Sequence, residues 1–142
     1  MILLDTNAVI FALAGHRRAR PLARHAGSLY FSPVTLIEMQ FLQEVGRGRF
    51  TTADPLAAAR EDPRWTVDDP SIDALVTAAL PLTWTRDPFD RLLAAHALHR
   101  GWRLATTDAA LLGTAEQHRS RVAELVLDTA VVDKAPWLAV GS

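Results

Sequence analysis

Residues 86–101 read RDPFDRLLAAHALHRG and contain the signals for one complete helix. Asp87 is suited to the N-cap, because its carboxylate can accept a backbone N–H that the first helical turn leaves free. Pro88 follows at the first helical position, where its missing N–H costs nothing, and Gly101 stands where helices commonly end in a left-handed residue. The residues between them are apolar almost all round, which indicates a helix buried on more than one side.

Short apolar runs alternate with helical patterns along the rest of the chain. The strand candidates are residues 2–4, 28–31, 65–67, 102–106 and 124–128, and the helical patterns cover 8–14, 33–45, 56–61, 72–80 and 88–100, with a short helix beginning at 109–112. This alternation predicts an α/β fold with a parallel sheet and right-handed crossovers. The carboxyl ends of the strands then share one edge, which is where open α/β sheets bind ligands.

The length and composition limit the choice of function. A chain of 142 residues is long enough for one domain with a real core. It has no cysteine, which excludes disulfides and thiolate metal sites. No stretch approaches the ~20 apolar residues of a membrane helix, and no secretory leader is visible, so we expect a cytoplasmic protein without membrane contact. The net charge of −1 does not by itself indicate nucleic-acid binding.

Four acids are expected to meet at the carboxyl edge of the sheet. Asp5 and Asp108 each follow a strand, Asp90 lies in the first turn of the central helix, and Glu38 joins them if its helix packs beside the first strand. Close carboxylates raise one another's pKa, so such a cluster needs a cation. Oxygen ligands without cysteine favour Mg²⁺ or Mn²⁺, and a metal-bound water at such a site can attack a phosphodiester.

Each of these acids also has a simpler explanation. Asp5, Asp87 and Asp108 can all be helix caps. Glu38 lies in the apolar half of its helix, where a buried carboxylate without a partner is expensive. It therefore needs either a surface position or a cation. The four acids together are harder to explain by capping than any one of them.

Four segments, in this order and spacing, resemble the PIN-domain ribonucleases, and most closely the VapC-type toxins of bacterial toxin–antitoxin pairs. They are ILLDTNAVI, SPVTLIEM, RDPFDRLLAAHAL and LATTDAALL, of which DPFDRLLAA is the most specific. The resemblance spans about residues 2–127 and leaves 128–142 unassigned. It implies that residues 1–142 form a single PIN domain, a three-layer α/β/α sandwich with a parallel sheet of about five strands in the order 3-2-1-4-5.

The resemblance also implies an activity. It suggests a Mg²⁺-dependent endoribonuclease, with Mn²⁺ as a substitute, that cleaves single-stranded or structured RNA by metal-activated water. The acids of the family pattern, taken as both catalytic and metal-binding, fall on Asp5, Glu38, Asp90 and Asp108. Supporting positions are expected at Thr6, Asn7, Arg86, Asp87, Arg91 and Thr106. His96 stands where relatives often carry glutamine, a difference that we expect not to matter.

The family also implies protein partners. These are a second copy of the chain, in a homodimer, and a small VapB-type antitoxin that neutralises the toxin. We expect the antitoxin to bind an apolar groove near the first two helices. The candidate contacts are Phe11, Leu13, Phe41 and Leu42.

Two other classes of protein stay open. A receiver-like signalling domain also gathers acids around Mg²⁺, but it needs an acidic pair after the first strand and a lysine near the last. Here Asp5 is followed by Thr6 and Asn7, and Lys134 comes late in the chain. A catalytically inactive PIN-like domain could act only as a binding module, although it would have no reason to keep four mutually repelling acids. Metal-dependent RNA cleavage separates the ribonuclease from both, and phosphotransfer to an aspartate would identify a receiver.

Overall fold

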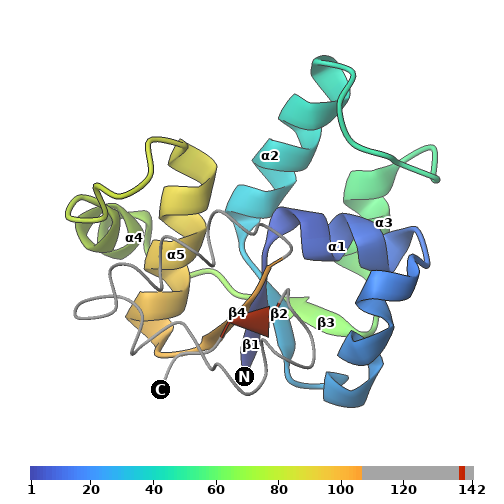
Figure 1. The fold of residues 1–142 in the computed structure, drawn as a ribbon, viewed down its shortest axis with the longest axis horizontal. Helices are drawn as coiled ribbons and strands as arrows, with labels where there is room; N and C mark the ends of the chain where they lie inside the picture. Colours follow the sequence, from blue (N-terminus) through green and yellow to red (C-terminus); the bar gives the residue numbers. More distant parts are fainter. Residues whose placement is uncertain (107–137, 140–142) are drawn as a thin grey trace.

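The computed structural model describes residues 1–106 and 138–139, which form a sheet with helices on both sides (Figure 1). The five strands have the order β3-β2-β1-β4-β5. The four neighbouring strands β3, β2, β1 and β4 are parallel. Their bounds are β1 Ile2–Leu4, β2 Leu29–Phe31, β3 Trp65–Val67 and β4 Arg103–Ala105. The predicted order and the parallel centre of the sheet are confirmed.

The edge strand differs from the prediction in origin and direction. It is β5 (Leu138–Ala139), which lies antiparallel to β4 and comes from the tail that the sequence left unassigned. Two residues are too few to show the alternation by which a strand is recognised. The strand expected at residues 124–128 and the short helix expected from 109 lie outside the described residues.

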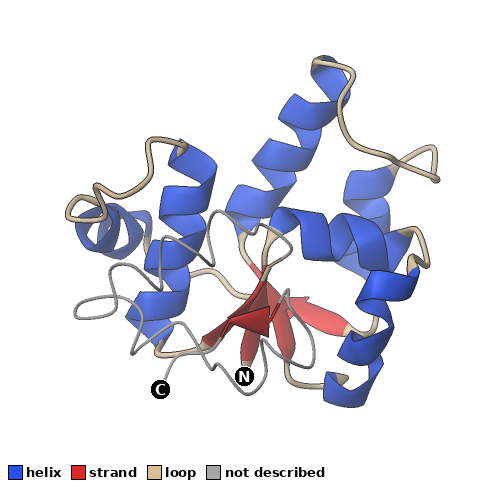
Figure 2. Ribbon diagram, viewed as in Figure 1, coloured by secondary structure: helices blue, strands red, loops and turns tan. Residues whose placement is uncertain are grey.

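Four helical segments cover one face of the sheet (Figure 2). They are α1 (Thr6–Leu13), the 3₁₀ segment η1 (Arg17–His25), α2 (Pro33–Glu44) and α3 (Pro55–Glu61). Side chains on a strand alternate between the two faces, so Ile2 and Leu4 point into the core beneath these helices. That core also contains Val9, Phe31, Met39 and Trp65.

The opposite face is covered by α4 (Ile72–Ala79) and α5 (Pro88–Arg100). Leu3 and Leu104 of the sheet pack there against a run of small side chains on α5, namely Ala94, Ala95 and Ala97. The bounds predicted for α5 are confirmed, since the side chain of Asp87 caps its first turn and Gly101 ends it with a φ of 68°. None of the helices in the described part of the chain is both long and apolar enough to cross a bilayer.

Candidate active site

Asp5 lies at the carboxyl end of β1 and is only 6% exposed. Its Oδ1 accepts the backbone N–H of Ala8 at 2.7 Å, so it is the N-cap of α1. Its own backbone N–H donates to the carbonyl of Ala105 at 2.8 Å, which places it beside the end of β4. The cap explanation is therefore confirmed. It does not exclude a second task, because a carboxylate has two oxygens and about four lone-pair sites.

Glu38 joins this edge through Thr6. The hydroxyl of Thr6 donates to Oε1 of Glu38 at 2.5 Å, and the hydroxyl oxygens of Thr6 and Thr35 lie 3.3 Å apart. Both threonines are buried, so the half-buried end of α2 is tied to the first turn of α1. The helix that carries Glu38 thus packs beside the first turn of α1, which directly follows the first strand.

The charge of Glu38 is poorly compensated by its surroundings. Burial raises the pKa of Glu38, the hydrogen bond from Thr6 opposes that rise, and the negative charge of Asp87 adds to it. No arginine or lysine forms an ion pair with Glu38 within the described residues. From the sequence, Glu38 needs either a surface position or a nearby cation. In the structure its carboxylate is half-buried, and an added cation would stabilise its ionised form.

Asp87 and Asp90 stand at the start of α5, next to α2 (Figure 1). Oδ1 of Asp87 accepts the backbone N–H groups of Phe89 at 2.9 Å and of Asp90 at 3.3 Å. The rings of Phe89 and Phe41 lie 5.8 Å apart, which joins this turn to α2. Asp87 is therefore a cap whose charge reaches Glu38, while the half-buried carboxylate of Asp90 is the one that we expect to bind the metal.

The donor types at this edge of the sheet suit a hard divalent cation. They are carboxylates, with hydroxyls beside them, and Mg²⁺ and Mn²⁺ prefer such oxygen ligands. Within residues 1–106 and 138–139, no three acidic or histidine side chains lie close enough to hold one ion together. Asp108, the fourth predicted acid, lies outside the described residues. The buried carboxylate of Asp5 and the raised pKa of Glu38 fit a bound cation by the chemistry of the donors.

The expected supporting residues do different things. Thr6 donates to Glu38, whereas Arg91 turns to α4, where its guanidinium donates to the carbonyls of Ala79 at 2.9 Å and Leu80 at 2.6 Å. These bonds satisfy carbonyls that a helix end leaves open, so Arg91 holds α4 against α5. The others are Thr106, buried after β4, and the exposed Asn7 and Arg86.

The structure gives His96, where we expect the difference from relatives not to matter, a specific partner. The side chain is fully buried in the middle of α5 and bonds Asp68 at 2.7 Å. A histidine within an apolar helical run and an acid after the third strand were both visible in the sequence. Their pairing was not, because 28 residues separate them.

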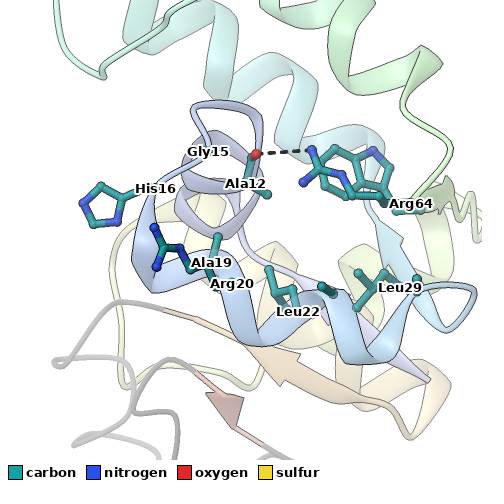
Figure 3. Close-up of a pocket in the computed structure, with 11 residues that line it drawn as sticks. Ala12, Gly15, His16, Ala19, Arg20, Leu22, Leu29 and Arg64 are labelled. Carbon is teal, nitrogen blue, oxygen red and sulfur yellow. Dashed lines mark hydrogen bonds between the residues drawn. The ribbon is translucent and has the colours of Figure 1, made fainter.

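A cavity of about 330 Å³ lies away from these acids, between α1, η1 and the start of β3 (Figure 3). Its wall is largely apolar, with Leu22, Leu29 and Trp65, and it also contains Arg20 and Arg64. The guanidinium of Arg64 donates to the carbonyl of Ala12 at 3.2 Å, which holds it across the α1 side of the cavity. None of the predicted acids in the described part of the chain lines this cavity, so it is a candidate for a partner rather than for chemistry.

Known proteins resemble the chain in both sequence and fold. The family model described as PIN domain matches residues 2–117. Ribonuclease VapC22 of Mycobacterium tuberculosis is 32% identical over 118 residues, which cover 78% of this chain and 88% of that protein.

Two solved structures share the fold. VapC20 of Mycobacterium tuberculosis, a Sarcin-Ricin loop cleaving toxin, matches 80% of this chain and 94% of its own at 21% identity and a TM-score of 0.60. VapBC2 from Rickettsia felis, bound to a DNA fragment from its promoter, matches 90% of this chain and 98% of its own at 19% identity and a TM-score of 0.60.

Proposed function

The chain belongs to the PIN domain family, and from this premise we propose that it is a Mg²⁺-dependent endoribonuclease acting as the toxin of a toxin–antitoxin pair. The observation that carries the proposal is the hydrogen bond from Thr6, which follows Asp5 at the carboxyl end of β1, to Glu38 on α2. Its relative VapC22 is named a ribonuclease, which supports the same activity here. We also propose that the protein acts in the cytoplasm.

In the proposed reaction, the four acids share the task of holding the metal ion. Asp5, Glu38, Asp90 and Asp108 would hold the ion, and Mn²⁺ could replace Mg²⁺. When bound, the ion would lower the pKa of a water molecule, so that this water can lose a proton and attack a phosphodiester, and it would also polarise the phosphate. The α1 cap fixes the direction of the Asp5 carboxylate, and the Thr6 hydroxyl fixes that of Glu38. Both residues are thus orientated before an ion or RNA arrives, which lowers the cost of assembling the site.

Two helix N-termini, those of α1 and α5, hold Asp5 and Asp90. Each carries a partial positive charge from the helix dipole, which offsets part of the repulsion between the carboxylates. It also favours the phosphate of a bound RNA. Whether the chain prefers single-stranded or structured RNA then depends on the surface around the acids. Incubation of the purified chain with RNA, with Mn²⁺ and with a chelator, tests the activity: cleavage must require the ion.

A second copy of the chain fits two exposed apolar stripes. Residues four apart on a helix lie on one face, and each stripe has three such residues: Ile37, Phe41 and Val45 on α2, and Ile72, Val76 and Leu80 on α4. Their exposed fractions run from 43% for Val76 to 79% for Ile72. Large apolar side chains exposed in a row mark protein contacts. We assign both stripes to the homodimer, and Phe41 with them.

The antitoxin is assigned to the cavity between α1 and η1. Of the contacts expected from the sequence, Leu13 and Leu42 are partly buried against the core, and the half-buried ring of Phe11 stacks on His16 at 4.7 Å. The cavity beside them offers an apolar wall with arginines, which suits an apolar side chain flanked by acids. The fold shared with VapBC2 supports a partner of this kind. Co-expression with the neighbouring gene product should restore growth and give a co-purified complex. Replacing Leu22 by Glu in the cavity should abolish both.

A further inference from the structure

His96 has an unusual environment for a histidine. It is fully buried, its Nε2 lies 2.7 Å from Oδ2 of Asp68, and its Nδ1 is buried without a hydrogen-bond partner in the part of the chain that the structure describes. Since Asp68 accepts, Nε2 must carry the proton, which leaves Nδ1 as a bare acceptor when the ring is neutral. Buried polar atoms without partners are rare and costly, so this one calls for an explanation.

Asp68 is the centre of a network that joins α5 to the end of β2. Arg100 donates to it through Nε at 2.9 Å and through Nη2 at 3.2 Å. The backbone N–H of Asp68 donates to the carbonyl of Phe31 at 3.0 Å, which fixes it to the end of β2. Two residues of α5 are therefore bonded to one carboxylate, and that carboxylate is bonded to the sheet.

Two aromatic side chains, Trp102 and Tyr30, pack beside this network. The ring of Trp102 lies 6.2 Å from that of His96, and the guanidinium of Arg100 lies 5.8 Å from the centre of the Trp102 ring. The ring of Tyr30 on β2 lies 4.6 Å from Trp102. His96 thus contacts an aromatic ring as well as the carboxylate of Asp68.

We propose that the network of His96, Asp68 and Arg100 positions α5 against the sheet, so that the first turn of α5 presents Asp90 to Asp5, and that it does so only while His96 is neutral. His96 lies six residues after Asp90, about 9 Å along the helix, which separates it from that proposed ligand. His96 is a positioning residue for the proposed site. The expected effect on RNA cleavage rests on the proposed function, whereas the contacts of His96 with Asp68 and Trp102 do not.

The charges around His96 explain why neutrality matters. Burial lowers the pKa of His96, the carboxylate of Asp68 opposes that effect, and the positive charges of Arg100 and His99 add to it. A protonated ring would place a second N–H, on Nδ1, among groups that offer it no acceptor. Because the folded protein holds this proton more weakly than the unfolded chain does, stability declines as the pH falls below the ordinary value of 6.5. We expect α5 to loosen over the same interval.

The test follows the backbone amide of Asp90 by ¹⁵N NMR between pH ~5 and 8, where histidines titrate. In the metal-free wild type, the amide shift of Asp90 should follow the titration of the His96 ring. In His96→Gln, whose side-chain amide can still donate to Asp68 but does not titrate, this component should be absent. His99→Gln, an exposed neighbour on the same helix, is the control and should keep the component that follows His96, moved toward higher pH because the positive charge of His99 is removed. An Asp90 amide that ignores the His96 titration, or that responds equally in His96→Gln, would overturn the proposal.

Cleavage kinetics give the second readout. His96→Leu, which cannot bond Asp68, should lower kcat by about tenfold or more at neutral pH, since small misplacements of reacting groups are costly. Its KM should change little. His96→Gln should restore kcat and keep more of it than wild type toward acid pH. Equal kcat values in wild type and His96→Leu would count against positioning. Absence of cleavage in every protein would reject the proposed function, while the NMR experiment would still decide the positioning claim.

Discussion

Asp87 and Asp90 stand three residues apart, and we predict that their substitutions fail in different ways. In Asp87→Ala, two backbone N–H groups, 2.9 and 3.3 Å from Oδ1, lose their acceptor. Loss of an N-cap costs about 1 kcal/mol, which for a domain of this size lowers the Tm by about 3 °C. Removal of the Asp87 charge beside Glu38 offsets a small part of that cost, and most of the cleavage activity should remain.

The matched variant Asp87→Asn separates the cap from the charge. Asparagine caps as well as aspartate, so the Tm should hardly change, and any change should be upward because Glu38 loses a negative neighbour. Asp90→Asn should abolish cleavage, because it removes a proposed ligand. It should leave the metal-free protein as stable as wild type or slightly more stable, since it relieves repulsion between carboxylates.

The assay is thermal melting and RNA cleavage on all three variants, without and with Mn²⁺. An inactive Asp87→Asn together with an active Asp90→Asn would show that we have assigned the pair backwards. An Asp87→Ala protein with the same Tm as wild type would show instead that the hydrogen bonds of the cap contribute nothing to stability. Either result would refute the reasoning from the geometry of α5.

Three further predictions concern the metal, Glu38 and the dimer. Millimolar Mn²⁺ should raise the Tm of the wild type, because a ligand that binds only the folded state stabilises it; an indifferent Tm would reject the site. Glu38→Gln should raise the Tm of the metal-free protein at neutral pH, because burial penalises only the ionised side chain, and Mn²⁺ should then stabilise the variant less than wild type. Val76→Glu on α4 should give a monomer in size-exclusion chromatography, whereas the exposed neighbour Thr77→Glu should remain a dimer.

Local signals account for what the sequence predicted best. The bounds of α5 follow from the Asp87 cap and from Gly101, which act within four residues of themselves. The carboxyl-edge position of Asp5 follows from the strand directly before it. The strand order came from the resemblance to PIN domains, and the structure confirms it.

Contacts between distant residues could not be predicted. The bond from Thr6 to Glu38 spans 32 residues and depends on how α2 settles beside α1. The pairing of His96 with Asp68 depends in the same way on the packing of α5. Neither pair has a fixed spacing that marks it, and the residues concerned look like an ordinary polar turn or an ordinary helical histidine.

Asp5→Asn tests the central claim most directly, because the structure gives Asp5 a capping task that asparagine can still perform. The matched control is Asp54→Asn at the N-cap of α3, where Oδ1 of Asp54 accepts the N–H of Ala57 at 3.1 Å. Both variants should melt close to wild type without metal. Asp54→Asn should cleave RNA normally with Mn²⁺, whereas Asp5→Asn should lose activity by orders of magnitude, since the ion that activates water loses a ligand. Cleavage by Asp5→Asn within a few-fold of wild type would contradict the account, because Asp5 would then be only a cap.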